Sequence, residues 1–315
     1  MATFTSKASG NWSATGQTTW NEVGAPTGAD TVTINSGHVV TYDADLTHTA
    51  AITVNGTLQG SGLRVLTLSN VVLTVKAGAA ITNTGGIFEI KIGAANSQAS
   101  VGVVIGESSG SRATVTGEST TNYIKFTDGA FIRGGKCNAQ RTDFSKVGTV
   151  ASVAAFAFYP STSDTFSWTN CTFDADCGRI QNTVALNAAA IFVLEDNIFL
   201  STGQNLTTSL ATGAITSGTR SIQRNWFGGS LGTSGGTGQW YDVTLKHNVI
   251  CGGLYNNDTN DYPWASGSGF NVIRWLGAGG LVVKASTSAS LPWYLHIHNP
   301  SASITNCRGM VPSIR

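Results

Sequence analysis

Six-residue windows recur along the second half of the chain at intervals that suit the coils of a parallel β-solenoid. Each window begins with a large apolar residue, carries Asn or Cys at its fourth position and ends with Phe or Ile. The windows are WTNCTF at 168–173, LEDNIF at 194–199, IQRNWF at 222–227 and LKHNVI at 245–250. Their starts are separated by 26, 28 and 23 residues, which is about one solenoid coil and too irregular for a repeat of helical pairs.

The fourth position of these windows predicts a column of stacked side chains. If successive coils lie directly above one another, Asn197, Asn225 and Asn248 form a ladder at an inward corner. Each amide can then donate to the coil on one side and accept from the coil on the other. Cys171 and Cys307 occupy the same position, because the ITNC that ends at Cys307 matches the WTNC that ends at Cys171.

Two further stretches extend this pattern. The sequence AQRTDF at 139–144 begins 29 residues before Trp168 and fits as a weaker window. Between Leu245 and Ile304 there is room for two more coils, and residues 270–284 are expected to supply the middle one. Glycine-rich stretches at 228–238 and 252–280 predict loops that leave the stack between strands.

The first ninety residues predict very short strands with tight turns between them. Apolar and polar residues alternate from Thr31 to Ile34, which indicates one buried and one solvated face. In Ser36-Gly37 and Asn55-Gly56, glycine can take the positive φ that a tight reversal needs. The expected strands span residues 30–34, 38–42, 51–54, 66–69 and 72–76.

A set of motifs near the start covers about a quarter of the chain. They are GNW at 10–12, TW at 19–20, Gly24 with Pro26, GADTVTINSGHVVTYDAD at 28–45, ITVNGTLQ at 52–59 and LTLSNVVLTVKAGAAI at 66–81. Together they resemble the eight-glycine domain of animal extracellular proteins and of bacterial and phage proteins. The resemblance implies a β-rich module at the start of a right-handed parallel β-helix. We therefore expect an all-β chain, with residues 1–90 as an eight-glycine-like module continuous with the solenoid and residues 91–315 as a parallel β-helix with glycine-rich lateral loops.

Charge and hydropathy exclude several classes of partner. Charged residues make up only 11% of the chain, and 18 basic residues nearly balance 17 acidic ones, so no net field attracts nucleic acid. No uninterrupted apolar stretch reaches the ~18 residues of a bilayer span, so no membrane insertion is expected. The start, MATFTSKASG, lacks the basic and then apolar layout of a secretory signal, which favours assembly in a host cytoplasm.

The cysteines favour the same compartment and indicate no metal. Their number is odd and their spacing is not that of a zinc site, so buried reduced thiols are expected. The five cysteines are Cys137, Cys171, Cys177, Cys251 and Cys307.

The sequence also predicts no calcium or cofactor site. The oxygen-rich residues 256–261 lack the spacing of a helix-loop-helix calcium site, and no cofactor motif is present.

Asp174 and Asp176, with Arg179 nearby, form the best acidic cluster for glycan cleavage. On a strand, carboxylates at i and i+2 point to the same side, where one could act as acid and the other as base. The same residues also suit a solvated turn after Phe173. By contrast, Glu195 and Asp196 are adjacent, so their side chains are expected to point in opposite directions.

Five aromatic residues concentrated in 25 positions are candidates for binding a glycan or a partner. Exposed aromatic faces stack on pyranose rings or pack against another subunit, whereas buried ones pack under the glycine-rich loops. Both interpretations stay open from the sequence. The residues are Trp240, Tyr241, Tyr255, Tyr262 and Trp264.

Three classes of function remain compatible with this chain. The favoured hypothesis is a virion-associated structural protein or adhesin, such as a phage spike, fibre or capsid-decorating element, with a host surface glycan as candidate ligand. Its expected partners are other virion proteins and further copies of itself, with a homotrimer favoured. One alternative is a depolymerase, a glycoside hydrolase or polysaccharide lyase, acting on bacterial surface glycan. The other is a cellular glycan-binding surface module.

Overall fold

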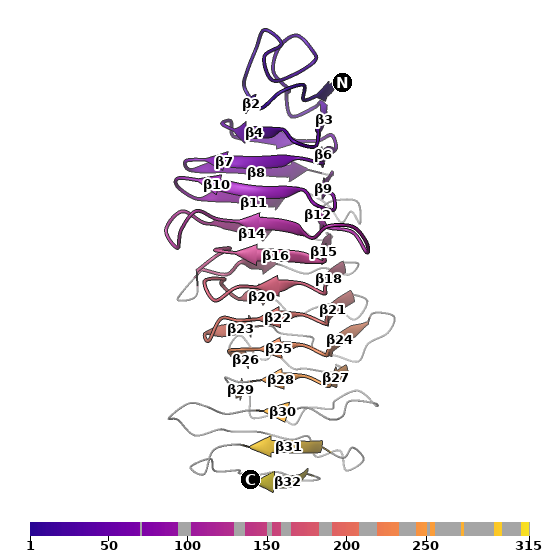
Figure 1. The fold of residues 1–315 in the computed structure, drawn as a ribbon, viewed down its shortest axis with the longest axis vertical. Coiled ribbons are helices and arrows are strands. Elements are labelled where there is room, and N and C mark those ends of the chain that lie inside the picture. Colours follow the sequence, from indigo (N-terminus) through magenta and orange to yellow (C-terminus); the bar gives the residue numbers. More distant parts are fainter. Residues whose placement is uncertain are drawn as a thin grey trace.

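The chain winds into an elongated stack of β-coils, with its two termini at opposite ends (Figure 1). In the computed structural model, the described residues are 1–69, 71–93, 102–128, 136–149, 153–158, 165–182, 191–207, 219–232, 244–250, 253–255, 272–273, 293–297 and 310–314. All regular structure in these residues is β-strand. No helix in the described segments is long and apolar enough to cross a bilayer. The expected all-β parallel β-helix is therefore confirmed.

The strands form three long sheets in which neighbours run parallel, and a typical coil contributes one strand to each sheet. We call them sheet 1, sheet 2 and sheet 3 in the order in which a coil visits them. Sheet 1 contains β1 (Thr3–Thr5), β3 (Thr31–Ile34), β6 (Ile52–Val54), β9 (Val72–Val75), β12 (Gly102–Ile105), β15 (Lys136–Gln140), β18 (Thr165–Thr169), β21 (Ile191–Glu195), β24 (Arg220–Gln223) and β27 (Thr244–Lys246).

Sheet 2 has eleven strands. It contains β2 (Gly10–Asn11), β4 (Val39–Tyr42), β7 (Thr57–Ser61), β10 (Ala80–Thr84), β13 (Ala113–Thr116), β16 (Thr142–Ser145), β19 (Thr172–Phe173), β22 (Ile198–Phe199), β25 (Trp226–Phe227), β28 (Val249–Ile250) and β30 (Val272–Ile273).

Sheet 3 closes each coil, and a separate parallel pair lies near the C-terminus. Sheet 3 contains β5 (Leu46–His48), β8 (Arg64–Ser69), β11 (Phe88–Gly93), β14 (Ile124–Asp128), β17 (Phe156–Phe158), β20 (Ile180–Asn182), β23 (Gln204–Thr207), β26 (Ser230–Gly232) and β29 (Gly253–Tyr255). The pair is β31 (Trp293–Ile297) with β32 (Met310–Ile314). Sheet 3 is continuous across residue 90, the expected boundary between the N-terminal module and the solenoid. Strand β11, which contains this residue, pairs with β8 before it and with β14 after it.

The core is a set of columns that run along the stack. On the inner face of sheet 2, Phe144, Phe173, Phe199 and Phe227 occupy matching positions on successive strands. Their rings stack with centroid separations of 4.7, 4.3 and 4.9 Å. Each buried ring stabilises the fold by roughly 1.5 to 3 kcal/mol, because its apolar surface is removed from water. Since the rings of successive coils cover one another, every coil is stabilised by its two neighbours.

The six-residue windows span the corner between sheets 1 and 2. Their first residue lies on a sheet 1 strand and their last on the next sheet 2 strand, as Trp168 and Phe173 do. The weaker window at 139–144 belongs to the same set, because Ala139 pairs with Trp168 and Phe144 with Phe173. The segment expected to supply the middle window contains β30, which pairs with β28.

Some local expectations were wrong. The five short N-terminal strands are present with small shifts at their ends, but β1, β2, β5, β7 and β10 were not predicted. The glycine-rich stretches at 228–238 and 252–280 do not consist only of loops, because they contain β26, β29 and β30. Glycine weakens a strand, but stacking between neighbouring coils supplies the pairing that local propensity does not.

Two turn glycines serve different purposes. Gly37 has φ = +80°, as expected for a tight reversal. Gly56 has no positive φ, and the expectation for it was wrong. A Cβ at Gly56 would lie 2.2 Å from the carbonyl oxygen of Asn35 and 2.4 Å from that of His38, so glycine is needed there for close approach to the preceding turn.

Candidate functional site

A repeated corner between sheets 1 and 2 organises the described second half of the chain. Five of the seven non-glycine residues with positive φ in the described segments lie at this corner, each directly before an inward-pointing residue. A single left-handed residue turns the chain so that the next side chain points into the coil. The five residues and their φ values are Arg141 (48°), Asn170 (53°), Asp196 (58°), Arg224 (54°) and His247 (56°).

The inward residues after this corner form a hydrogen-bonded ladder. The side-chain nitrogen of Asn197 donates to Oδ1 of Asn225 (2.9 Å), and that of Asn225 donates to Oδ1 of Asn248 (3.0 Å). The same nitrogens also donate to main-chain oxygens one coil back, at Trp168 and Leu194 (both 2.8 Å). All three asparagines are buried, so these bonds replace the water that the amides would otherwise need.

Cys171 precedes the first asparagine in this column. Its main-chain nitrogen donates to Oδ1 of Asn197 (2.9 Å), while its thiol lies near the carbonyl oxygen of Thr169 (3.4 Å). Burial raises the pKa of Cys171 to about 12, and it also raises the pKa of Cys137 and Cys177. The three thiols are unpaired, buried and protonated, which is unlike a reactive cysteine. Cys307 lies outside the described residues.

Ion pairs decorate the outside of the corner. Arg224 contacts the carboxylates of both Glu195 (3.1 Å) and Asp196 (2.7 Å). The expectation that these adjacent acids point in opposite directions was wrong, because the left-handed φ of Asp196 breaks the alternation of an extended strand. Hydrogen bonding to Arg224 holds the pKa of Asp196 below its usual value.

The acidic cluster proposed for catalysis lies in a turn. Strand β19 ends at Phe173, so the assumption that Asp174 and Asp176 share one side of a strand was wrong. Asp174 accepts hydrogen bonds from the Ser145 hydroxyl and from the main-chain nitrogen of Asp176 (3.0 Å). Arg179 bonds instead to Gln181 (3.0 Å). Both oxygens of Asp174 therefore serve the turn and its contact with the preceding coil.

The five aromatic candidates are largely outside the described structure. Tyr255 ends strand β29, next to Gly232 of β26, and its side chain is not described. Trp240, Tyr241, Tyr262 and Trp264 lie outside the described residues. Their role as a glycan or partner platform therefore stays a prediction.

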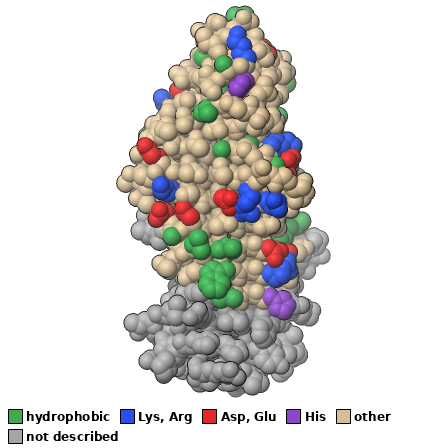
Figure 2. All heavy atoms as spheres, viewed as in Figure 1, with side chains coloured by type: hydrophobic (Ala, Val, Ile, Leu, Met, Phe, Trp, Pro, Cys, Tyr) green, Lys and Arg blue, Asp and Glu red, His purple; other side chains and the backbone are tan. Residues whose placement is uncertain are grey.

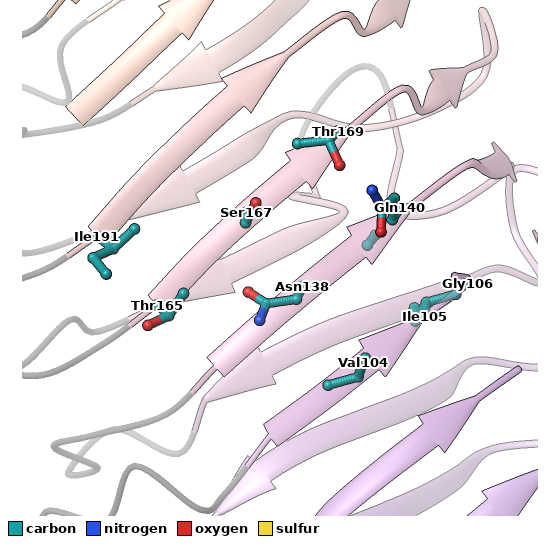
Figure 3. A pocket seen from close by; sticks show the side chains of 10 residues that line it. Val104, Ile105, Gly106, Asn138, Gln140, Thr165, Ser167, Thr169 and Ile191 are labelled. Carbon is teal, nitrogen blue, oxygen red and sulfur yellow. The ribbon is translucent and has the colours of Figure 1, made fainter. Parts of the chain in front are cut away.

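Described residues on the outer face of sheet 1 form a groove. It has a volume of about 460 Å³ and crosses strands β12, β15, β18 and β21 (Figure 3). This volume falls within the range of roughly 300–1,000 Å³ that is usual for small-molecule sites. Its lining residues are Val104, Ile105, Gly106, Asn138, Ala139, Gln140, Thr165, Ser167, Thr169 and Ile191.

The polar side chains of the groove are arranged in rows along the rod. Asn138 pairs in register with Ser167, and Gln140 pairs with Thr169, so amides on one coil face hydroxyls on the next. Neighbouring strands are about 4.8 Å apart, which sets the spacing of these groups. The amide nitrogen of Asn138 is placed to donate to the main-chain oxygens of Thr165 and Cys137, each 3.2 Å away, which fixes that side chain.

The described lining of the groove contains hydroxyl, amide and apolar groups but no ionisable side chain. Glu195 pairs in register with the groove residue Thr169, and its carboxylate is held by Arg224 and by the hydroxyl of Ser221 (2.5 Å). Hydroxyls and amides both donate and accept hydrogen bonds, which suits a neutral, hydroxyl-rich ligand.

Sequence reasoning did not find this groove. Its residues extend from Val104 to Ile191, and only the coil register brings them together. Taken singly, Ser, Thr, Asn and Gln on the outward side of a strand are typical of any solvated face. The corner did leave a signal, because the third residue of every window is polar and never β-branched.

No family model matches the chain, and no curated protein or solved structure matches it. The groove must therefore be interpreted from its own geometry. That geometry comprises a rigid parallel scaffold, rows of uncharged polar groups and two apolar side chains, Val104 and Ile191, within one surface depression.

Proposed function

We propose that this protein is a virion-associated structural rod that acts as an adhesin and binds a neutral surface glycan in the groove of sheet 1. The observation that carries the proposal is the uncharged polar lining of that groove. Sugars present hydroxyl groups around an apolar ring face, which rows of amides and hydroxyls beside Val104 and Ile191 can match. The resemblance of residues 10–81 to the eight-glycine domain supports a place among phage proteins.

Binding is favoured over cleavage for two reasons. The described groove lining offers no carboxylate or imidazole for proton transfer, and Asp174 is engaged by Ser145 and by its own turn. Retaining and inverting glycosidases need a pair of carboxyl groups on opposite sides of the scissile bond. A binding rod needs only a rigid display of polar groups, which the stacked coils supply.

Assembly inside a host cell is consistent with the thiols. Cys137, Cys171 and Cys177 are buried and unpaired, and protonated thiols persist in a reducing compartment. Mass spectrometry of purified virus particles tests this part of the proposal. Peptides of this chain in stoichiometric amounts with capsid or tail proteins would support it, whereas their recovery from the host cell surface alone would contradict it.

Glycan binding can be tested with a matched pair of variants. Ser167 and Thr33 occupy one outward column of sheet 1, but only Ser167 lines the groove. On an array of capsular and lipopolysaccharide glycans, Ser167→Trp should fill the groove and weaken binding at least about tenfold, or ~1.4 kcal/mol. Thr33→Trp should leave binding unchanged.

Two results would overturn the glycan assignment. Equal loss of binding in both tryptophan variants would mean that the groove is not the site. Shortening of a bound polysaccharide, detected as new reducing ends and abolished in Asp174→Asn or Asp176→Asn, would show that the protein is a depolymerase instead.

A further inference from the structure

The outward face of sheet 2 changes character along the rod. One column of residues, aligned by strand register, begins with Val39, which is 36% exposed, and is then small or polar in five successive coils: Thr57, Ala80, Thr114, Asp143 and Thr172. From the next strand onward the same column is apolar. It continues with Ile198, Trp226 and Val249.

Two of these apolar side chains are exposed, and Val249 is partly buried. Ile198 is 45% exposed and Trp226 41%, and Leu200, beside them, is 48% exposed. We call Ile198, Leu200, Trp226 and Val249 the apolar column. Figure 2 shows it as a continuous apolar patch on the face that carries β22 and β25. A contiguous apolar patch on a solvent-exposed face is typical of an interaction surface.

The two edges of sheet 2 carry opposite charge above this column. At the corner with sheet 1 lie Arg112 and Arg141, with Asp143 next to Arg112 (2.8 Å); we call this the basic edge. With the ion pair of Lys76 and Glu107 at the same corner, three cationic groups there face two carboxylates, so the net charge of the described residues is positive. Figure 2 shows charged groups on both sides of the sheet 2 face.

The opposite corner, with sheet 3, is acidic. It carries the three carboxylates of Glu118, Asp174 and Asp176 and two cationic groups, those of Arg179 and of Lys146, which bonds to the carbonyl oxygen of Glu118 (3.1 Å). We call it the acidic edge. Asp176 is exposed, and its carboxylate is free to meet a cation from outside the molecule.

We propose that sheet 2 docks against a second copy of this chain, parallel to the first and related to it by a rotation axis along the rod. Under that symmetry, each coil lies beside the equivalent coil of the other copy, so the apolar column of one copy packs against that of another. The basic edge of one copy then lies beside the acidic edge of its neighbour, which is favourable. An antiparallel arrangement that overlaps along the full length of the rod would place the apolar column against the polar upper coils.

The size of the face also fits a protein partner. Eleven strands spaced by about 4.8 Å give a length of about 50 Å, and strands that average about three residues add a width of about 10 Å, or ~500 Å² in all. A standard interface buries about 800 Å² per partner, which this face and its two edges can supply. A bound sugar would use Trp226 but not the charged edges.

The docking surface is independent of the groove, because the groove lies on sheet 1 and the apolar column on sheet 2. Copies joined through sheet 2 keep their sheet 1 faces open. Several grooves on one particle would then act together, which strengthens attachment to a repeating ligand. The oligomer can nevertheless form whether or not the groove binds glycan.

Sedimentation equilibrium of the full-length protein tests the surface. We expect the wild-type chain to sediment as a multiple of its 32.7 kDa mass, and Trp226→Lys to raise the dissociation constant at least about tenfold. Val23→Lys is the matched control, because Val23 is 81% exposed but lies in the N-terminal loop. Circular dichroism on each variant establishes that it is folded.

Charge reversal identifies the orientation. Arg141→Glu or Asp176→Lys alone should weaken association, because each places like charges across the contact, and the double variant should restore it. Three results overturn the proposal: a monomeric wild-type chain at micromolar concentration, an oligomer that Trp226→Lys leaves intact, or a double variant no tighter than the single ones. Loss of glycan binding in Trp226→Lys without any change of mass would assign the patch to a sugar instead.

Discussion

The side-chain nitrogen of Asn197 donates to Oδ1 of Asn225 in the next coil across 2.9 Å, inside a core that excludes water. The main-chain nitrogen of Asn197 donates to that same oxygen (3.0 Å). One amide therefore satisfies a main-chain group and a side chain of the coil before it. This arrangement holds adjacent coils in register, since a slip by one residue would leave buried groups without partners.

Removing the middle amide should destabilise the rod. Asn225→Leu takes away the acceptor for Asn197 and the donor to Leu194 and Asn248. We expect the free energy of unfolding to fall by about 1 to 3 kcal/mol, because buried polar groups of the neighbouring coils each lose a hydrogen bond. Urea denaturation followed by circular dichroism measures this. Asn11→Leu, at an exposed asparagine of β2, should change stability by less than about 0.5 kcal/mol.

The ladder could be predicted because a polar residue recurred in an apolar frame. Asn197, Asn225 and Asn248 hold the same place in their windows, and only stacked coils satisfy amides at such a place. The corner residue before each of them was not foreseen. Its left-handed φ depends on how the strand must turn between two sheets, which local propensity does not reveal.

The phenylalanine stack should be sensitive to shape. Phe199 lies between Phe173 (4.3 Å) and Phe227 (4.9 Å), and its side chain is buried. Phe199→Ala should cost about 3 to 5 kcal/mol, because a cavity is left between two rings. Phe199→Leu fills most of that space and should cost less than about 1.5 kcal/mol. Equal losses of thermal stability in the two variants would contradict a tightly packed column.

The functional site was harder to predict than the fold. Asp174 and Asp176 were the candidates for glycan cleavage because paired carboxylates can act as acid and base, yet the structure places both in a turn. Ser167 and Gln140 are chemically ordinary, and they become a groove only when four strands align. A repeat in the sequence reveals inward columns, since those must be apolar or self-satisfying, whereas outward columns face water and tolerate many residues.

The N-terminal end of the rod should be sensitive to acid. His48 is fully buried against Trp12, with ring centroids 5.2 Å apart, and its Nε2 lies 3.4 Å from the hydroxyl of Tyr42. Burial lowers the pKa of His48 to about 4. In the unfolded chain its pKa is about 6.5, so the unfolded state binds a proton that the folded state refuses between these values.

The sign of the effect follows from that difference. Above pH 6.5 His48 is neutral in both states and adds no pH dependence. As the pH falls from 6.5 to about 4, stability should decrease by up to about 1.4 kcal/mol per pH unit, and the loss should level off below pH 4. His48→Gln removes this contribution while retaining the acidic groups. If the free energy of unfolding changes with pH to the same extent in both proteins between pH 6.5 and 4, the prediction is wrong.

The left-handed corner can be tested at His247, where φ is 56° and the side chain is exposed. Replacement by Val should destabilise the protein by about 1 to 2 kcal/mol, because a β-branched side chain clashes with the main chain in this conformation. His247→Asn should stay within about 0.5 kcal/mol of the native protein, since asparagine adopts the left-handed region readily. Both variants remove the imidazole, so a difference in thermal midpoint between them reports on the main chain alone. If Val and Asn have the same effect, the turn of the chain at this corner does not depend on a left-handed residue.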